Sequence, residues 1–315
     1  MLIEIPVPLR TFAMVERIHS DLPWLHMTTP TPSAVRPVRP WRGLSPTMAP
    51  SLADSRRQLH HAVQLATAVG ISWLPAQADD SHTNLEWVHH LGGVFCGVVP
   101  VTEPFRVGLR VEPLGLVVVD ERTAQTEVFP LHGQRVTEAG QWLRERGGAH
   151  GADVSRFTLD RHYVIPHHPV ADGAPFDAAP RAAFAELAAW LDNGDATLRR
   201  IAEASPSASD VRLWPHHLDI ATLMSMSGGN SIGVGLELGD DYYAEPYFYV
   251  NVHPSPTAAE AARLRLAGSG QWHTDGWIGA VLPASRLTTV AADQPNQVSA
   301  FADSALAAAH RLVGG

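Results

Sequence analysis

Residues 231–253, SIGVGLELGDDYYAEPYFYVNVH, decide the fold, because two runs of alternating polarity lie on either side of a break rich in Gly and Asp. In 231–237 every second residue is isoleucine, valine or leucine, and in 247–253 every second residue is phenylalanine or valine. Successive side chains of a strand point to opposite faces of its sheet. The stretch therefore predicts two antiparallel strands joined by a turn at Gly239-Asp240-Asp241. One face is apolar, and the other carries Gly233, Gly235, Glu237, Tyr247, Tyr249, Asn251 and His253.

The preceding segment, 211–221 (VRLWPHHLDIA), adds a third strand to this meander. Gly228-Gly229-Asn230 gives the turn between the two. If 211–221 is one strand, His217 and Asp219 lie on the same polar face. A helix that begins at Pro215 is the alternative, and it pairs His216 with Asp219 and Ile220 instead.

Outside the meander, helical and strand patterns follow one another in the same order in two halves of the chain. Helical spacing of apolar residues predicts helices at 52–69 (ended by Gly70), 134–146 (ended by Gly147-Gly148), 177–192 and 296–313. Alternation predicts strands within 84–130, at 157–165 and near 277–282. We expect an α+β fold of antiparallel meander sheets with helices packed on one side, arranged as an α-β(n)-α tandem pseudo-repeat with halves at about 52–147 and 177–313.

The first 50 residues differ in composition from the rest of the chain. Prolines recur through 30–40, and each one removes a backbone donor and restricts the residue before it. We expect 1–50 to be a poorly ordered extension and 51–315 to form a single α+β domain. Met48 is an alternative start of the native protein, and a tail that docks on the domain is the other alternative.

Charge and residue usage exclude several classes of function. The 315 residues carry a net charge of −9, and all 23 basic residues are arginine. An acidic chain is unsuited to the phosphate backbone of nucleic acids, and a chain without lysine has neither a pyridoxal-phosphate Schiff base nor a P-loop lysine. Cys96 is the only cysteine, so one chain forms no disulfide and no cysteine-based metal site.

Membrane and secretion signals are also missing from the sequence. No apolar run reaches the roughly 18 residues of a membrane helix, and no secretory signal opens the chain. We therefore expect a cytoplasmic protein whose partner is a small molecule. The oligomeric state does not follow from the sequence.

The polar face of the meander carries the candidate site, because His, Tyr and carboxylates beside small residues are typical of a lined pocket. Mixed His and carboxylate ligands suit Zn²⁺ or Fe²⁺. A second dense segment, 271–277 (QWHTDGW), offers a base and its orienting carboxylate between two tryptophans. The expected metal ligands are His217, Asp219, His253 and His273; the expected catalytic residues are Glu237, Glu245, His273 and Asp275; the expected ligand-binding residues are Tyr247, Tyr249, Asn251, Trp272 and Trp277. A packed polar sheet face and a turn anchored by aromatic rings are the structural alternatives.

Three functions remain in competition. The first is an enzyme, metal-dependent in its strongest form, with Glu237 or Glu245 as the base. The second is a non-catalytic binding module that uses tyrosine and tryptophan rings as a platform. The third is a protein-interaction module that uses the acidic surface and residues 1–47.

Two segments resemble a bacterial family of unknown function: 213–222 (LWPHHLDIAT) and 239–250 (GDDYYAEPYFYV). The order of elements is also similar to that of a larger uncharacterised group, in which a Phe-Asp-Leu-Ala strand precedes a strand rich in Tyr and Pro. The likeness covers about 50–313 and is strongest over 211–283. It implies a bacterial, cytoplasmic, single-domain protein and brings no activity with it.

Overall fold

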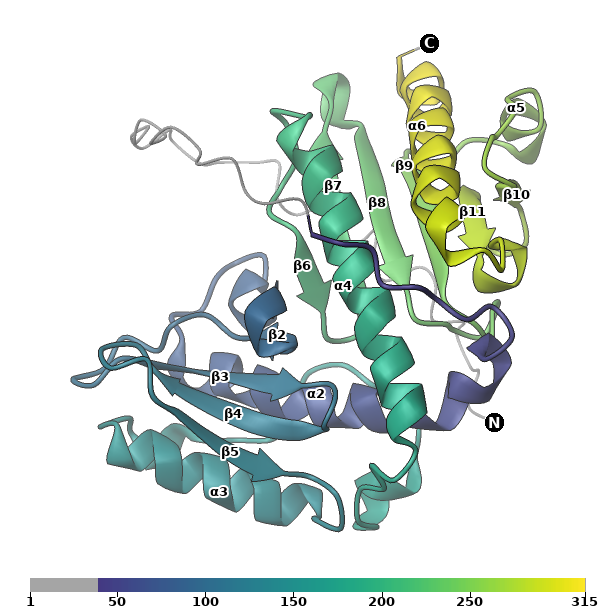
Figure 1. Ribbon diagram of the computed structural model, residues 1–315. Coiled ribbons are helices and arrows are strands. Elements are labelled where there is room, and N and C mark those ends of the chain that lie inside the picture. The colour runs from purple at the N-terminus through teal and green to yellow at the C-terminus, as the bar shows by residue number, and fades with distance from the viewer. Residues whose placement is uncertain (1–38, 315) are drawn as a thin grey trace, which may run out of the picture.

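The computed structural model describes residues 39–314, and the expected α+β class is confirmed (Figure 1). In this part of the chain, two antiparallel sheets of five and six strands combine with five α-helices. None of the helices in residues 39–314 is long and apolar enough to cross a membrane.

The first half runs from a helix through five strands to a second helix. Its sheet has the order β1-β2-β3-β4-β5, so each strand pairs with the next one along the chain. The elements are α2 (Ala53–Trp73), β1 (Glu86–Val88), β2 (Gly93–Phe95), β3 (Phe105–Arg110), β4 (Gly115–Asp120), β5 (Thr126–Pro130) and α3 (Val136–Ala149).

The second half repeats this succession of helix, strands and helix. Its sheet has the order β10-β11-β9-β8-β7-β6, so the meander holds from β6 to β9 and breaks where β11 pairs with β9. The elements are α4 (Arg181–Glu203), β6 (Arg212–Trp214), β7 (Asp219–Ser225), β8 (Ser231–Glu237), β9 (Tyr247–His253), α5 (Ala258–Ala261), β10 (Gln271–His273), β11 (Gly279–Pro283) and α6 (Gln294–Val313).

The two sheets meet at their first strands. Leu85, just before β1, exchanges both backbone hydrogen bonds with Leu213 of β6, at N···O distances of 3.1 and 2.7 Å. Glu86 accepts one hydrogen bond at 3.0 Å from Nη2 of Arg199 in α4, and it lies 3.7 Å from the guanidinium of Arg212. The halves are therefore joined side by side, with one hydrophobic core continuing across the seam.

Three predicted helix ends are wrong. The helix expected at 177–192 is α4, which ends at Glu203, and the other two predicted ends lie at glycines that serve packing. α2 continues past Gly70 to Trp73, and a Cβ at position 70 would collide with the backbone carbonyl of His82. α3 likewise continues through Gly147, whose bare Cα lies against the ring of Trp73. Glycine in a helical pattern indicates a close approach as readily as an end.

The strand expected at 157–165 is also absent from the described structure, where this segment is a loop on α2. The Phe157 ring packs at 5.2 Å from that of Trp73, and the backbone N–H of Thr158 donates to Ser72 Oγ at 3.0 Å. An extended loop docked on a helix shows the same alternation as a strand.

The two faces of the second sheet differ in the way that the alternation predicts. α4 lies over β7 and β8, and α6 over β9, on the face of Ile220, Leu236 and Val250 (Figure 1). Glu237 pairs with Tyr247, and Gly235 with Tyr249, on the opposite, polar face. Neither α4 nor α6 covers that polar face.

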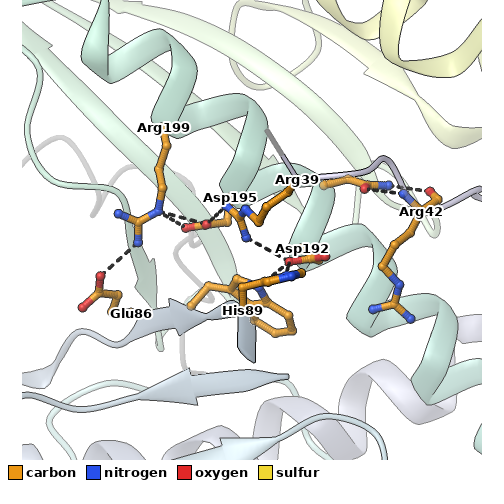
Figure 2. A network of polar contacts seen from close by, with 9 residues as sticks. Arg39, Arg42, Glu86, His89, Asp192, Asp195 and Arg199 are labelled. Carbon is orange, nitrogen blue, oxygen red and sulfur yellow. Dashed lines mark hydrogen bonds and ion pairs between the residues drawn. The ribbon is translucent and has the colours of Figure 1, made fainter. Parts of the chain in front are cut away.

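The strap, which we define as residues 39–47, corrects the expectation of a poorly ordered extension (Figure 2). The buried side chain of Gln294 accepts from the backbone N–H of Leu44 at 2.9 Å and donates to its carbonyl at 2.8 Å. Asn193 forms the same pair of bonds with the backbone of Arg42, at 3.0 and 2.7 Å. The prediction for 1–50 is thus wrong from residue 39 onward, and residues 1–38 lie outside the described part of the chain.

Candidate functional site

Strand register brings two acidic side chains together on the polar face. Ile220 of β7 pairs with Leu236 of β8, so the neighbouring residues, Asp219 and Glu237, lie opposite each other at the ends of the two strands. Side chains directly opposite in an antiparallel pair have Cβ atoms about 4.5–5.5 Å apart. We call Asp219 and Glu237 the acid pair.

The acid pair is buried and only partly satisfied. Asp219 is 8% exposed and Glu237 7% exposed. The hydroxyl of Tyr249 donates to Asp219 Oδ2 at 2.6 Å. Asp219 Oδ1 and Glu237 Oε1, in contrast, are buried and have no hydrogen-bond partner within residues 39–314. Buried polar atoms without partners are rare in folded proteins and commonly mark a ligand, an ion or a water.

Burial shifts the protonation of both carboxyl groups. It raises the pKa of Glu237 well above its ordinary value of 4.5, and the neighbouring charges of Asp219 and Asp240 raise it further, against the opposing charge of Arg56. Burial also raises the pKa of Asp219, while His217 and the hydrogen bond from Tyr249 lower it. Two adjacent buried carboxylates repel each other, so the pair retains a proton more readily than an exposed acid does.

Arg56 reaches the acid pair from the first half of the chain. Its Nη1 lies against the Cα of Gly239, two residues after Glu237, where any side chain would collide with it. This buried Nη1 has no hydrogen-bond partner in the described residues, and burial lowers the pKa of the guanidinium. Arg56 is not among the site residues predicted from the sequence. The spacing of Arg56 and His60 is the sequence signal that could have predicted it. The two residues are four positions apart and so share one face of the predicted helix.

The turn before β7 changes the place predicted for His217. Residues 215–218 form a turn between β6 and β7, and Leu218 adopts a positive φ of 68°. Residues 214–223 are therefore neither one strand nor a helix, and His217 lies on the turn instead of the strand face. His217 still contributes to the site, since its charge acts on Asp219.

Two further histidines lie at this turn. The Pro215 carbonyl lies 2.9 Å from Nε2 of His60, and the ring of His216 lies 4.3 Å from that of His217. Burial lowers the pKa of both His60 and His216 to about 3, so both rings are neutral near pH 7. Neither one supplies positive charge to the acid pair there.

Side chains fill the space that the glycines of β8 were expected to leave for a ligand. A Cβ at position 235 would collide with the ring of Tyr249, and one at position 233 with the side-chain oxygen of Asn251. The two glycines therefore let Tyr249 and Asn251 lie flat across β8. This arrangement sets the Tyr249 hydroxyl on Asp219.

The aromatic residues pack on one another instead of forming an open cage. The ring of His273 lies 4.5 Å from that of Trp277, and the ring of Tyr243 lies 4.8 Å from that of Tyr247. His273 Nδ1 is 3.0 Å from the Tyr243 hydroxyl, and its Nε2 is 2.7 Å from the backbone carbonyl of Asp275. The predicted pairing of His273 with the carboxylate of Asp275 is wrong, because the partner is a main-chain oxygen.

The remaining predicted site residues lie away from the acid pair. His253 is at the opposite end of β9 from Tyr247, about 20 Å along the strand at about 3.3 Å per residue. Glu245 accepts hydrogen bonds from the backbone N–H and Oγ of Ser285, at 2.6 and 2.7 Å. Trp272 points to the core face and donates from Nε1 to the Leu264 carbonyl at 2.8 Å.

The four expected metal ligands are not brought to one point. His253 is too far from Asp219 to share an ion with it, and His273 uses both of its nitrogens in the contacts above. In residues 39–314, no group of three or more His, Cys, Asp or Glu residues has an arrangement that could hold a metal ion. The combined Zn²⁺ or Fe²⁺ site of the sequence analysis does not form in this structure.

Comparison of the chain with family models, curated protein sequences and solved structures gives no match. The resemblance to a bacterial family of unknown function therefore stays a prediction.

Proposed function

We propose that this chain is an enzyme that transfers a proton to or from a small polar molecule, with Glu237 as the general acid and Asp219 as the general base. The observation that carries the proposal is the pair of buried carboxyl oxygens on adjacent strands that have no hydrogen-bond partner among the described residues. A carboxylic acid that keeps its proton near neutral pH is a competent proton donor, and burial is the usual means of achieving it.

The neighbouring groups support different roles for the two acids. Tyr249 donates to Asp219 at 2.6 Å, which favours the ionised form of that carboxyl. Glu237 receives no side-chain hydrogen bond from residues 39–314, and burial and then the charge of Asp219 raise its pKa. Glu237 is therefore the member of the pair that holds a proton more firmly. Arg56 and the Tyr249 ring would orient the substrate beside it.

The experiment detects proton transfer without knowledge of the substrate. The protein is incubated in D₂O with a mixture of bacterial metabolites, and proton NMR follows the loss of C–H signals by exchange with solvent. We expect the wild type to remove at least one signal, and Glu237→Gln to slow that exchange by at least about 100-fold, the range of general acid–base catalysis.

Glu245→Gln is the matched control, because Glu245 lies in an exposed loop on Ser285. It should exchange like the wild type. Equal exchange by Glu237→Gln and wild type would contradict the proposal. A metabolite that raises the melting temperature without any exchange would favour the non-catalytic binding module instead.

The cellular location and the binding partner of the protein belong to the same proposal. The acidic composition fits a small-molecule partner better than a nucleic acid. A bacterial, cytoplasmic protein is what the family resemblance implies. Fractionation of the native host with an antibody to the chain would test the location.

A further inference from the structure

We propose that the strap is a releasable latch: Arg39 braces the turn of α4 that packs on the two strand residues beside the acid pair, and release of Arg39 loosens the packing there. This inference rests on the proposed function only in taking the acid pair as the centre that is controlled.

The latch contact is a buried ion-pair network (Figure 2). Arg39 donates from Nη1 to Asp192 Oδ1 at 2.9 Å and from Nη2 to Asp195 Oδ2. The side chains of Asp192 and Asp195 are 4% and 1% exposed, whereas that of Arg39 is 19% exposed. The Arg39 guanidinium thus lies on the solvent side of the two buried carboxylates.

Release of Arg39 leaves both aspartates with other partners. Asp192 Oδ1 also lies 2.8 Å from Trp87 Nε1 and 2.7 Å from His89 Nδ1. Asp195 also accepts from Arg199 Nε, at 2.9 Å to each oxygen. The network therefore survives the loss of Arg39, as a latch requires, because no buried carboxylate is left alone.

The rest of the strap stays attached when Arg39 leaves. Trp41 Nε1 donates to Gln294 at 3.1 Å, and the backbone of Ser45 donates to Glu186 at 2.7 Å. These bonds do not involve Asp192 or Asp195. The strap thus has one releasable end next to a fixed anchor.

The latched turn of α4 touches the neighbours of the acid pair. Gly194 lies between the two aspartates in sequence, and a Cβ there would press on Leu236 and lie 3.4 Å from Ile220. Ile220 follows Asp219 in β7, and Leu236 precedes Glu237 in β8. A shift of this turn therefore changes the packing beneath both acids, because close-packed interiors transmit displacement.

The test compares Arg39→Ala with Arg42→Ala in the full chain by carbon-13 NMR titration of the Asp219 and Glu237 carboxyl groups. Looser packing admits water, so Arg39→Ala should lower the midpoint of the pair by at least about 0.5 pH unit, a threefold change in proton affinity. Arg42→Ala should leave the midpoint unchanged, since Arg42 bonds to Asn193 through its backbone.

Rescue separates the latch from general loosening of the fold. Millimolar methylguanidinium should restore the midpoint in Arg39→Ala, and millimolar methylammonium should not, because one ammonium cannot reproduce the two-pronged contact. If Arg39→Ala does not fold, Arg39→Lys replaces it in the same titration. An unchanged midpoint, or an equal fall in Arg42→Ala, would overturn the latch.

The readout needs no substrate. A failed titration test would therefore leave proton transfer by the acid pair standing, and a failed D₂O exchange test would leave the latch standing.

Discussion

Two pairs of buried carboxylates lie on opposite faces of the β7–β8 region, and they are treated differently by the fold. Asp192 and Asp195, on α4, receive two arginines, a tryptophan N–H and a histidine (Figure 2). The acid pair receives one tyrosine hydroxyl and keeps two oxygens without a partner in the described residues. A buried charge is tolerated when it is paired and hydrogen-bonded. The α4 aspartates are thus paired supports of the fold, whereas the acid pair carries a desolvation cost that its hydrogen bonds do not offset.

The largest expected effect on stability comes from substitution of an aspartate in α4. Asp195→Ala removes the buried carboxylate that Arg39 and Arg199 share and leaves them only Asp192 and Glu86, respectively, which should lower the free energy of unfolding by about 3–5 kcal/mol. Urea denaturation measures the change. Asp210→Ala removes a 78% exposed partner of Arg212 and should change stability by less than about 1 kcal/mol. Similar losses in the two variants would remove the distinction between supporting and exposed acids.

A smaller effect is expected where the fold holds the acid pair in place. Gly235→Ala pushes the Tyr249 ring off β8 and removes its hydrogen bond to Asp219. The cost should be about 1–3 kcal/mol, as for other overpacked sites. Thermal denaturation gives the stability, and tyrosine ultraviolet difference spectra report the ring. A stable Gly235→Ala protein with an unchanged spectrum would show that the ring does not depend on this glycine.

Neutral replacement of the acid pair, in contrast, should not lower the free energy of unfolding. The double variant Asp219→Asn, Glu237→Gln keeps the shape and removes the desolvation cost of the charges. We expect it to be equal to or up to about 2 kcal/mol more stable than the wild type, since buried ionic groups are often replaced without loss. A loss of several kcal/mol in urea denaturation would instead make the pair a structural element.

The smallest and most specific effect is the pH dependence. The pKa of Glu237 is raised on folding, so between about pH 4.5 and its folded value the native chain holds a proton that the unfolded chain has released. Stability contributed by this group therefore falls as pH rises through that window, with a slope of up to about 1.4 kcal/mol per pH unit. The melting-temperature profile of wild type minus that of the double variant should show this fall as pH rises above about 4.5. A flat difference would mean that folding does not change the protonation of the pair.

The parts of the fold that depend on neighbours in sequence were predictable. The alternation of 231–237 and 247–253 determined the two faces, and the register confirms that Glu237, Tyr247 and Tyr249 share one of them. The helix, strands and helix order of both halves also followed from spacing. These features depend on which side of an element each residue lies, and that is fixed by the 2.0 and 3.6 residue periods.

The features that depend on distant contacts were not predictable. Gly70 and Gly147 indicated helix ends and turned out to be contact points for His82 and Trp73. The proline-rich strap indicated disorder from composition alone, yet Gln294 and Asn193 satisfy its backbone.

The same distinction between local sequence patterns and distant contacts applies to the candidate site. By itself, the sequence determined that Asp219, Glu237 and Tyr249 could share the polar face of a meander, because strand periodicity is local. Only the tertiary structure decided that Arg56 joins them from the other half, that His253 does not, and that Tyr249 lies across Gly235. Those outcomes depend on pairing register and helix packing, which bring together residues far apart along the chain, and no local period encodes such distances.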